Sequence, residues 1–372
     1  MDLSLSEQEQ QLKDSVLSFV EREATTTVLV DLQESETGFE QKWLASMADA
    51  GWLGALVSPE FGGVGANALE AALICEALGS GPVPGPFLAS SVVSAALLGA
   101  ADPSAGRDAT LAAIAEGHAV VVPACTVPGR SWDGLKTGLP AESSGDAVTL
   151  SHTLSYVPYA AGASHVLVPL EGSPTDRRRF ALVATDLPGV TSRLLPGFLA
   201  RNYEVSLDQV AVGEDALLTI GSPESLRDAL ALAYILVAAY QVGGCSSLLD
   251  RSVAYSNTRV QFGMPVGRFQ RVQDHIVELL NALDAASRGG WVRLECRADT
   301  EVIFTIEDTG AGIPADAMNH IFEPFFTTKA SGSGLGLPIV HAIVTQHGGS
   351  IGAENVPGGG GRFTVRFPRP SR

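Results

Sequence analysis

The sequence is short of basic residues and of cysteine, and each shortage excludes a class of protein. Its 372 residues include 24 Lys and Arg against 41 Asp and Glu, a formal net charge of −17 at pH 7. Because nucleic acids and anionic membranes attract basic surfaces, we do not expect unassisted binding to either. The four cysteines stand singly, without a CxxC pair or a short-spaced framework, which is typical of reduced thiols in a cytoplasmic protein.

The chain also lacks an export signal and has one long uncharged hydrophobic run. The residues after Met1 are charged and amphipathic, whereas a secretory signal has a basic start and an apolar centre, so a cytoplasmic location is expected. The run from Ala229 to Leu249 is long enough to cross a membrane. Gln241 and the pair Gly243 and Gly244 within it favour a buried core helix, and we predict no membrane span.

What is present is a chain of 372 residues, long enough for two or three domains, and its 45% hydrophobic and 17% charged residues are typical of a folded globular protein. From Ser4 to about Leu98 the apolar residues recur at helix spacing. From Ala119 to about Leu218 short alternating β-branched segments predict strands. Helix spacing returns from Pro223. The sequence therefore predicts a helical region, a β-rich region and a second helical region before its tail.

Two segments of this region resemble the acyl-CoA dehydrogenases: GWLGALVSPEFGGVG (51–65) and AYSNTRVQFGMPVGRFQRVQ (254–273). The resemblance covers residues 1 to about 276. It implies an all-α N-terminal domain (1–118), a β-rich middle domain (119–222) and a truncated helical domain, a partial bundle, at 223–276. Homo- or hetero-oligomers through this part are implied as well.

The resemblance further implies an FAD site. The residues that would hold the ADP half of FAD, across a subunit interface, are Arg259, Gln261, Phe262 and Gln270. Arg offers a planar charged fork to pyrophosphate, and Gln offers both a donor and an acceptor. Thr126 is the candidate contact to the flavin ring. The alternative interpretation of this segment is a polar helix end capped by Gly263.

The acyl-CoA dehydrogenation that the resemblance implies needs a base, because a proton leaves the carbon alpha to the thioester. The Glu that most family members supply has no counterpart in this sequence. A minority place it earlier, at a position matched here by Ala233, which cannot take a proton. Some heteromeric members contain a subunit without the base, which leaves a non-catalytic partner role open.

The tail carries a second set of motifs. A strand-like segment from Val302 to Ile306 leads into EDTGAGI, with Asp308 at the strand end and Gly310 and Gly312 beyond it. Asp308 can accept a hydrogen bond from the exocyclic amine of adenine, and the glycines permit a tight turn beside the ring. The segments IFEPFFTTK (321–329) and GSGLGL (332–337) follow, and the second opens a helix whose N-terminus suits phosphate.

In order and spacing these motifs resemble the histidine-kinase branch of the GHKL ATPases. The resemblance implies an α/β sandwich at residues 277–372, two-component signalling and ATP as ligand. The implied ATP-binding residues are Asn281, Asp308, Gly310, Gly312, Phe325, Lys329, Gly332, Gly334, Leu335 and Gly336. Phe322 and Phe326 would help Phe325 to anchor the lid over the nucleotide.

This ATPase-like part also departs from its family. The Asn that coordinates Mg²⁺ there is matched by Val277, whose side chain cannot ligate a hard cation, so no metal ligand and impaired phosphoryl transfer are expected. The histidine-bearing hairpin that accepts phosphate is absent, and no catalytic residue is assigned. Three functions stay open: an ATP-binding kinase-like module, a flavoprotein oxidoreductase acting on acyl-CoA, and a non-catalytic scaffold. The sequence indicates a fusion of two modules near residues 272–281.

Overall fold

The computed structural model describes residues 5–81, 83–128, 138–144, 147–171, 178–196, 201–269, 292–298, 301–308, 312–323, 326, 337–338, 341, 344–345, 349–356 and 360–368. The chain forms two compact units, Met1–Gly244 and Cys245–Arg372.

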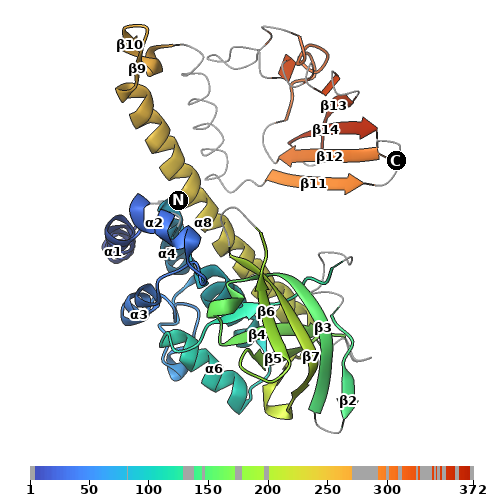
Figure 1. The fold of residues 1–372 in the computed structure, drawn as a ribbon. Helices are drawn as coiled ribbons and strands as arrows, with labels where there is room; N and C mark the ends of the chain where they lie inside the picture. Colours follow the sequence, from blue (N-terminus) through green and yellow to red (C-terminus); the bar gives the residue numbers. More distant parts are fainter. Residues whose placement is uncertain are drawn as a thin grey trace. The chain divides into compact units, whose positions relative to one another are not determined.

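The first unit begins with the predicted helical region. Its helices are α1 (Glu7–Glu23), α2 (Thr26–Glu34), α3 (Gln41–Asp49), α4 (Ala68–Ser80), α5 (Ala95–Ala100) and α6 (Ala105–Ala115), with a 3-10 turn η1 (Pro59–Phe61) and a π-helical segment η2 (Leu88–Ser94). Reciprocal capping boxes start α1 at Ser6 with Glu9, and α4 at Asn67 with Glu70. The helical prediction is confirmed, and Figure 1 shows these helices beside the strands of the unit.

Two four-stranded sheets follow in the first unit, as the alternating segments predict. One has the order β1-β4-β5-β8, formed by Val121–Pro123, His165–Leu170, Arg178–Ala184 and Leu217–Ile220. The other has the order β2-β3-β7-β6, formed by Glu142–Ser144, Ala147–Pro158, Asn202–Val212 and Val190–Leu194. Their apolar side chains join those of the helices in two hydrophobic clusters. The 3-10 turns η3 (Ala160–Gly162) and η4 (Glu214–Ala216) lie between strands.

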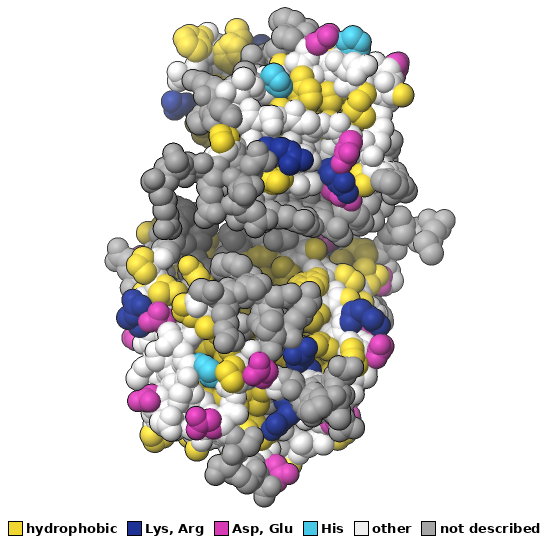
Figure 2. Space-filling model, turned by 90° about the vertical axis from the view of Figure 1, so that its right-hand side faces the viewer, with side chains coloured by type: hydrophobic (Ala, Val, Ile, Leu, Met, Phe, Trp, Pro, Cys, Tyr) yellow, Lys and Arg dark blue, Asp and Glu magenta, His cyan; other side chains and the backbone are white. Residues whose placement is uncertain are grey.

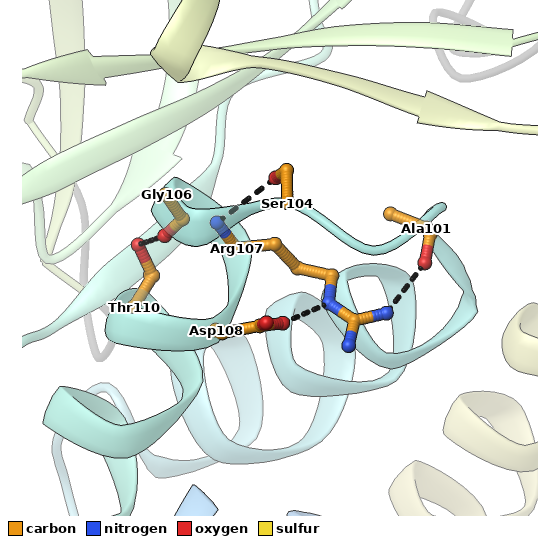
Figure 3. A network of polar contacts seen from close by, with 6 residues as sticks. All are labelled: Ala101, Ser104, Gly106, Arg107, Asp108 and Thr110. Atoms are coloured by element: carbon orange, nitrogen blue, oxygen red, sulfur yellow. Dashed lines mark hydrogen bonds and ion pairs between the residues drawn. The ribbon is translucent and has the colours of Figure 1, made fainter.

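The buried side chain of Arg107 stabilises the N-terminal end of α6 (Figure 3). The Arg107 Nη1 donates to the Ala101 carbonyl at 2.8 Å, and its Nε donates to Asp108 Oδ1 at 2.7 Å. Its guanidinium also lies 5.3 Å from the centre of the Phe61 ring, at cation–π distance. Because Arg107 is 8% exposed, its charge is compensated by these contacts more than by water.

We expect Arg107→Ala to lower the free energy of unfolding by about 2–3 kcal/mol, because it leaves the buried Ala101 carbonyl without its donor. The matched control is Arg22→Ala, since Arg22 pairs with Glu23 at 2.9 Å with its own side chain 65% exposed. That variant should change stability by less than about 0.5 kcal/mol. Urea unfolding followed by tryptophan fluorescence compares the two. Equal effects of the two substitutions would contradict the role given to Arg107.

The long helix α8 (Pro223–Thr258) packs on α4 through glycines, where the two backbones touch. A Cβ on Gly79 would lie 1.9 Å from the Tyr240 carbonyl oxygen, and one on Gly243 would lie 1.8 Å from the Glu76 carbonyl oxygen. No side chain fits at either position. The glycines in the uncharged run therefore serve helix packing.

The prediction of a buried core helix holds for one face of α8 and is wrong for the other. Ala233 and Leu236 are buried in the core, whereas Tyr234 and Ile235 are more than half exposed. α8 is the one described helix long and apolar enough to cross a membrane, and 22% of its most apolar window is buried. A helix that carries apolar residues on all of its sides does not reveal from its sequence which side is buried.

The second unit contains a small hairpin and an antiparallel sheet. The hairpin consists of β9 (Val260–Gln261) and β10 (Met264–Pro265), and the turn η5 (Val266–Arg268) follows it. The sheet has the order β11-β12-β14-β13, formed by Val292–Ala298, Glu301–Asp308, Gly361–Pro368 and Ser350–Asn355 (Figure 1). The strand predicted at 302–306 is confirmed within β12. Residues 270–291, which include the predicted junction of the two modules, lie outside the described part of the chain.

The described surface agrees with the deficit of basic residues. On the face drawn in Figure 2, the Lys and Arg side chains that are coloured stand alone or beside Asp and Glu, and they form no broad basic patch.

Candidate functional site

The first unit encloses a cavity of about 620 Å³, a volume that suits a small-molecule ligand. Its apolar walls include Leu29 and Leu32 of α2, Trp43, Leu44 and Met47 of α3, Leu88, Ala89 and Val93 of η2, Pro158 of β3 and Tyr240 of α8. Three different parts of the chain thus meet around one space: the N-terminal helices, the β-rich region and the returning helix.

The polar groups of this cavity are few. Burial raises the pKa of Tyr240 to about 12, and burial also raises the pKa of Tyr159. Both phenols therefore stay neutral at pH 7, and the Tyr240 hydroxyl donates to the Val83 carbonyl at 3.3 Å. The charged lining residues are Glu40 and Arg201. A cavity with these walls suits a bulky apolar group with a few polar atoms.

Three of the residues assigned to FAD lie together in the second unit. Arg259 precedes β9, and its backbone closes the hairpin by accepting from the Val266 N–H at 2.8 Å. Gln261 ends β9, and Phe262 occupies the turn with a φ of 53° and 90% of its surface exposed. The Phe262 ring contacts Phe269 edge to face, with the ring centres 6.2 Å apart.

The alternative interpretation of this segment, in which Gly263 caps a helix, is wrong. α8 ends at Thr258, and Gly263 has a φ of 81° in the tight turn between β9 and β10. The hairpin exposes the Arg259 guanidinium, the Gln261 amide and the Phe262 ring to solvent. These three groups fit the charged and flat parts of an ADP group. Gln270 lies outside the described residues. Thr126 lies in the first unit, half-buried, and its carbonyl accepts from the Ser155 N–H at 2.8 Å.

Two of the residues assigned to ATP, Asp308 and Gly312, are described, and residues 309–311 between them lie outside the described part of the chain. Asp308 is the last residue of β12 and pairs with Val292 of β11. Gly312 has a φ of 74°, which favours glycine. The other assigned residues lie outside the described part of the chain: Asn281, Gly310, Phe325, Lys329, Gly332, Gly334, Leu335 and Gly336.

An ion-pair cluster lies at the end of β12. Arg362 of β14 contacts Glu307 at 2.7 Å and Glu354 of β13 at 2.9 Å. The hydrogen bond to Glu307, and then the one to Glu354, raise the pKa of Arg362 further. The cluster links the end of β12 to both strands of the hairpin β13–β14.

Sequence reasoning missed Asn355, which contacts Ile313 from β13. Its side-chain amide makes two hydrogen bonds of 2.7 Å to the backbone of Ile313, donating to the carbonyl and accepting from the N–H. An Asn just before the glycine-rich PGGGG stretch was the available signal. The two rings next to the predicted lid are also described: Phe322 lies 5.4 Å from the His341 ring, and Phe326 lies 5.6 Å from the His320 ring.

Three family models match the chain. The acyl-CoA dehydrogenase N-terminal domain matches residues 6–118, and the acyl-CoA dehydrogenase C-terminal domain matches residues 224–299. The histidine kinase-, DNA gyrase B- and HSP90-like ATPase model matches residues 269–371, so the last two models overlap from residue 269 to residue 299.

Curated relatives divide between the same two families. The acyl-CoA dehydrogenase IpdE2 of Mycolicibacterium smegmatis is 30% identical over 278 residues, covering 74% of this chain and 73% of that protein. The sensor histidine kinase ZraS of Salmonella typhimurium is 40% identical over 108 residues, covering 27% of this chain and 23% of the kinase. The chain thus spans about a quarter of that kinase's length.

Solved structures share the fold of the part of the chain that resembles the acyl-CoA dehydrogenases. A variant of the Tcur3481-Tcur3483 steroid ACAD is 26% identical with a TM-score of 0.67, covering 77% of this chain and 76% of that one. Butyryl-CoA dehydrogenase from Megasphaera elsdenii is 20% identical with a TM-score of 0.67, covering 77% and 79%. At this identity the second likeness concerns the fold alone.

The helical, β-rich and helical parts around one apolar cavity define a flavoprotein dehydrogenase class, and the antiparallel sheet of β11 to β14 lies in the region that matches an ATPase class. The chain belongs to the acyl-CoA dehydrogenase family and carries at its carboxyl end a GHKL domain of the histidine-kinase type.

Proposed function

We propose that the chain binds ATP in a domain at residues 277–372 and transfers the phosphoryl group poorly. The observation that carries the proposal is the end of β12, where Asp308 ends the strand and Asn355 holds Ile313, inside a region that matches an ATPase family. Asp308 accepts from the adenine amine, Lys329 reaches a phosphate, and the glycines at 332, 334 and 336 bring backbone N–H groups to the triphosphate.

The weak phosphoryl transfer follows from Val277. At the position of Val277 a side-chain oxygen would help to hold Mg²⁺ between the phosphates, and valine has no such oxygen. ATP binding then depends on the adenine contacts and on the positive end of a helix, with little contribution from the metal.

Calorimetric titration with ATP, with Mg²⁺ and with EDTA, tests the proposal on the full chain. We expect the wild-type affinity to differ less than about 3-fold between the two conditions, and Val277→Asn to gain about 10-fold in Mg²⁺ alone, because it restores an oxygen ligand. Val277→Ala is the control that changes the side chain without adding a ligand. A wild-type affinity that collapses in EDTA, or no gain for Val277→Asn, contradicts the assignment.

The cavity of about 620 Å³ favours a second function, in which the dehydrogenase part binds FAD and an acyl-CoA thioester with a bulky acyl group. When bound, FAD supplies the acceptor for a hydride from the acyl chain. Arg259, Gln261, Phe262 and Gln270 hold its ADP half, and Thr126 contacts the ring. Ala233 is buried in the core at the position where a base would stand, so the acyl group is held without losing its proton.

Reconstitution with FAD separates this function from that of a scaffold. We expect acyl-CoA to shift the flavin absorption without bleaching it, and Phe262→Ala to lower FAD affinity by about 10-fold, because the ring loses its flat partner. Val260→Ala, exposed on the same hairpin, is the matched control. Bleaching by acyl-CoA would mean that a base exists elsewhere. Absence of both ligands would leave the chain as a cytoplasmic partner of another dehydrogenase subunit.

A further inference from the structure

Two of the polar side chains that line the cavity of the first unit, those of Arg201 and Tyr159, start from adjacent backbone positions. Tyr159 directly follows β3, and Arg201 directly precedes β7. Pro158 and Asn202 pair in the register of these two strands, and the Tyr159 N–H donates to the Arg201 carbonyl at 2.7 Å. The sheet therefore brings a cation and a phenol to a cavity whose walls are otherwise mostly apolar.

Arg201 is held in place by the end of α2 and the segment after it. Its Nη2 donates to the Leu32 carbonyl at 3.5 Å, in the last turn of α2, where the helix dipole favours a cation. Its aliphatic part packs on Gly38, since a Cβ at that glycine would overlap Arg201 Cγ. The φ of 75° at Gly38 also favours glycine. A side chain fixed in this way loses little conformational entropy when a ligand binds.

Tyr159 has a backbone conformation that residues other than glycine seldom adopt. Its φ is 52°, in the left-handed region. Its ring packs edge to face on the buried ring of Phe39, with the ring centres 5.9 Å apart. The Phe39 ring in turn occupies the space that a Cβ on Gly162 would need. Strain of this kind persists where the surrounding packing holds it, and here the packing keeps Tyr159 at the cavity.

The positive charge of Arg201 acts on the phenols near it. Burial raises the pKa of Tyr159, and the charge of Arg201 opposes this rise. The same two effects act on the pKa of Tyr203, whose hydroxyl donates to the Glu36 carbonyl. Both phenols therefore stay neutral at pH 7, and Tyr159 keeps a hydrogen that it can donate to a ligand oxygen.

We infer that Arg201 is a specificity-determining residue of the cavity, which selects an acyl group carrying a second carboxylate besides the thioester. The inference rests on the acyl-CoA binding proposed for the dehydrogenase part. A guanidinium can hold a carboxylate through two parallel N–H donors, and Tyr159 offers a further donor from the neighbouring strand. An acyl group with a plain alkyl end gives Arg201 no acceptor.

Glu40, the other charged residue of the lining, has the opposite effect on such a ligand. Its carboxylate repels the second carboxylate of the acyl group, whereas Arg201 attracts it. The two charges therefore orient the ligand, with its carboxylate toward Arg201 and away from Glu40.

Calorimetric titration of the full chain in the presence of FAD tests this selection with suberoyl-CoA and octanoyl-CoA, whose acyl chains differ only by a terminal carboxylate. We expect the wild-type chain to bind suberoyl-CoA about 10-fold more tightly. In Arg201→Gln this preference should disappear while the affinity for octanoyl-CoA stays unchanged. Arg201→Lys, which keeps the charge and loses the fork, should retain a preference of about 3-fold.

Glu40→Gln is the matched control, because it neutralises the lining residue of opposite charge. It should keep or increase the preference for suberoyl-CoA. Equal wild-type affinities for the two ligands overturn the inference and leave acyl-CoA binding standing. An equal loss of both ligands in Arg201→Gln also overturns it, because Arg201 would then only support the walls of the cavity. A preference that Glu40→Gln abolishes as fully as Arg201→Gln does so too. A wild-type chain that binds neither ligand overturns the proposed acyl-CoA binding itself.

Discussion

Asp308→Asn will weaken ATP binding by about 100-fold or more, because a charged acceptor is replaced by an amide that presents a donor to the adenine amine. Hydrogen bonds to charged groups are the strong ones in a partly enclosed site, and a mismatched pair leaves both groups unsatisfied. Calorimetric titration of the full chain measures the loss directly. The thermal midpoint should stay near that of the wild type, since Asp308 closes its strand through backbone pairing with Val292.

Asp316→Asn is the matched control for this experiment. Asp316 lies eight residues after Asp308 in the sequence, and it is exposed. Its neutralisation removes one negative charge near the site without touching the proposed adenine contact, so any effect of net charge on the triphosphate appears in both variants. Similar affinities for Asp308→Asn and Asp316→Asn would show that Asp308 does not bind the base.

Gly243→Ala should produce the largest change in stability, because the new methyl group would overlap the Glu76 carbonyl oxygen, 1.8 Å from the ideal Cβ position. Backbone cannot swing away as a flexible side chain can, so α8 must move off α4 at a cost of about 3 kcal/mol or more. For a unit of this size we expect the melting midpoint to fall by about 10 °C. Ligands of the neighbouring cavity should also be lost, since Tyr240 lines it one turn away.

Gly99→Ala provides the opposite control. Gly99 lies in α5, is exposed, and a Cβ there meets no atom within 4 Å. The same substitution should stabilise the protein by about 0.5–1 kcal/mol, because alanine loses less backbone entropy in a helix. Scanning calorimetry of the two variants compares them under one condition. A Gly243→Ala protein as stable as the wild type would show that α4 and α8 are not in backbone contact.

The regular elements could be predicted because their signals are local. The apolar positions of α1 repeat at helix spacing, and Val16, Phe19 and Val20 are the residues it buries. The alternation in β3 and β7 likewise predicts which side chains face the core. Motifs that depend on residue order, such as the Asp308 turn and the Arg259 segment, could be predicted from resemblance alone.

The features that were missed depend on distant parts of the chain. The two hydrogen bonds between Asn355 and Ile313 form only because β13 pairs with β14 and brings residue 355 to the end of β12. The exposed face of α8 could not be told from its buried face, since the run is apolar on all sides. Gly263 shows the same limit: a glycine after a helix can cap it or turn a hairpin, and the pairing of β9 with β10 decides.

Native mass spectrometry of the full chain after addition of ATP and FAD tests the central claim most directly, because each ligand adds its own mass to one module. We predict one ATP for each chain, lost in Asp308→Asn and kept in Asp316→Asn, whether or not FAD is retained. A folded chain that takes up no ATP at concentrations saturating for other GHKL domains would contradict the account.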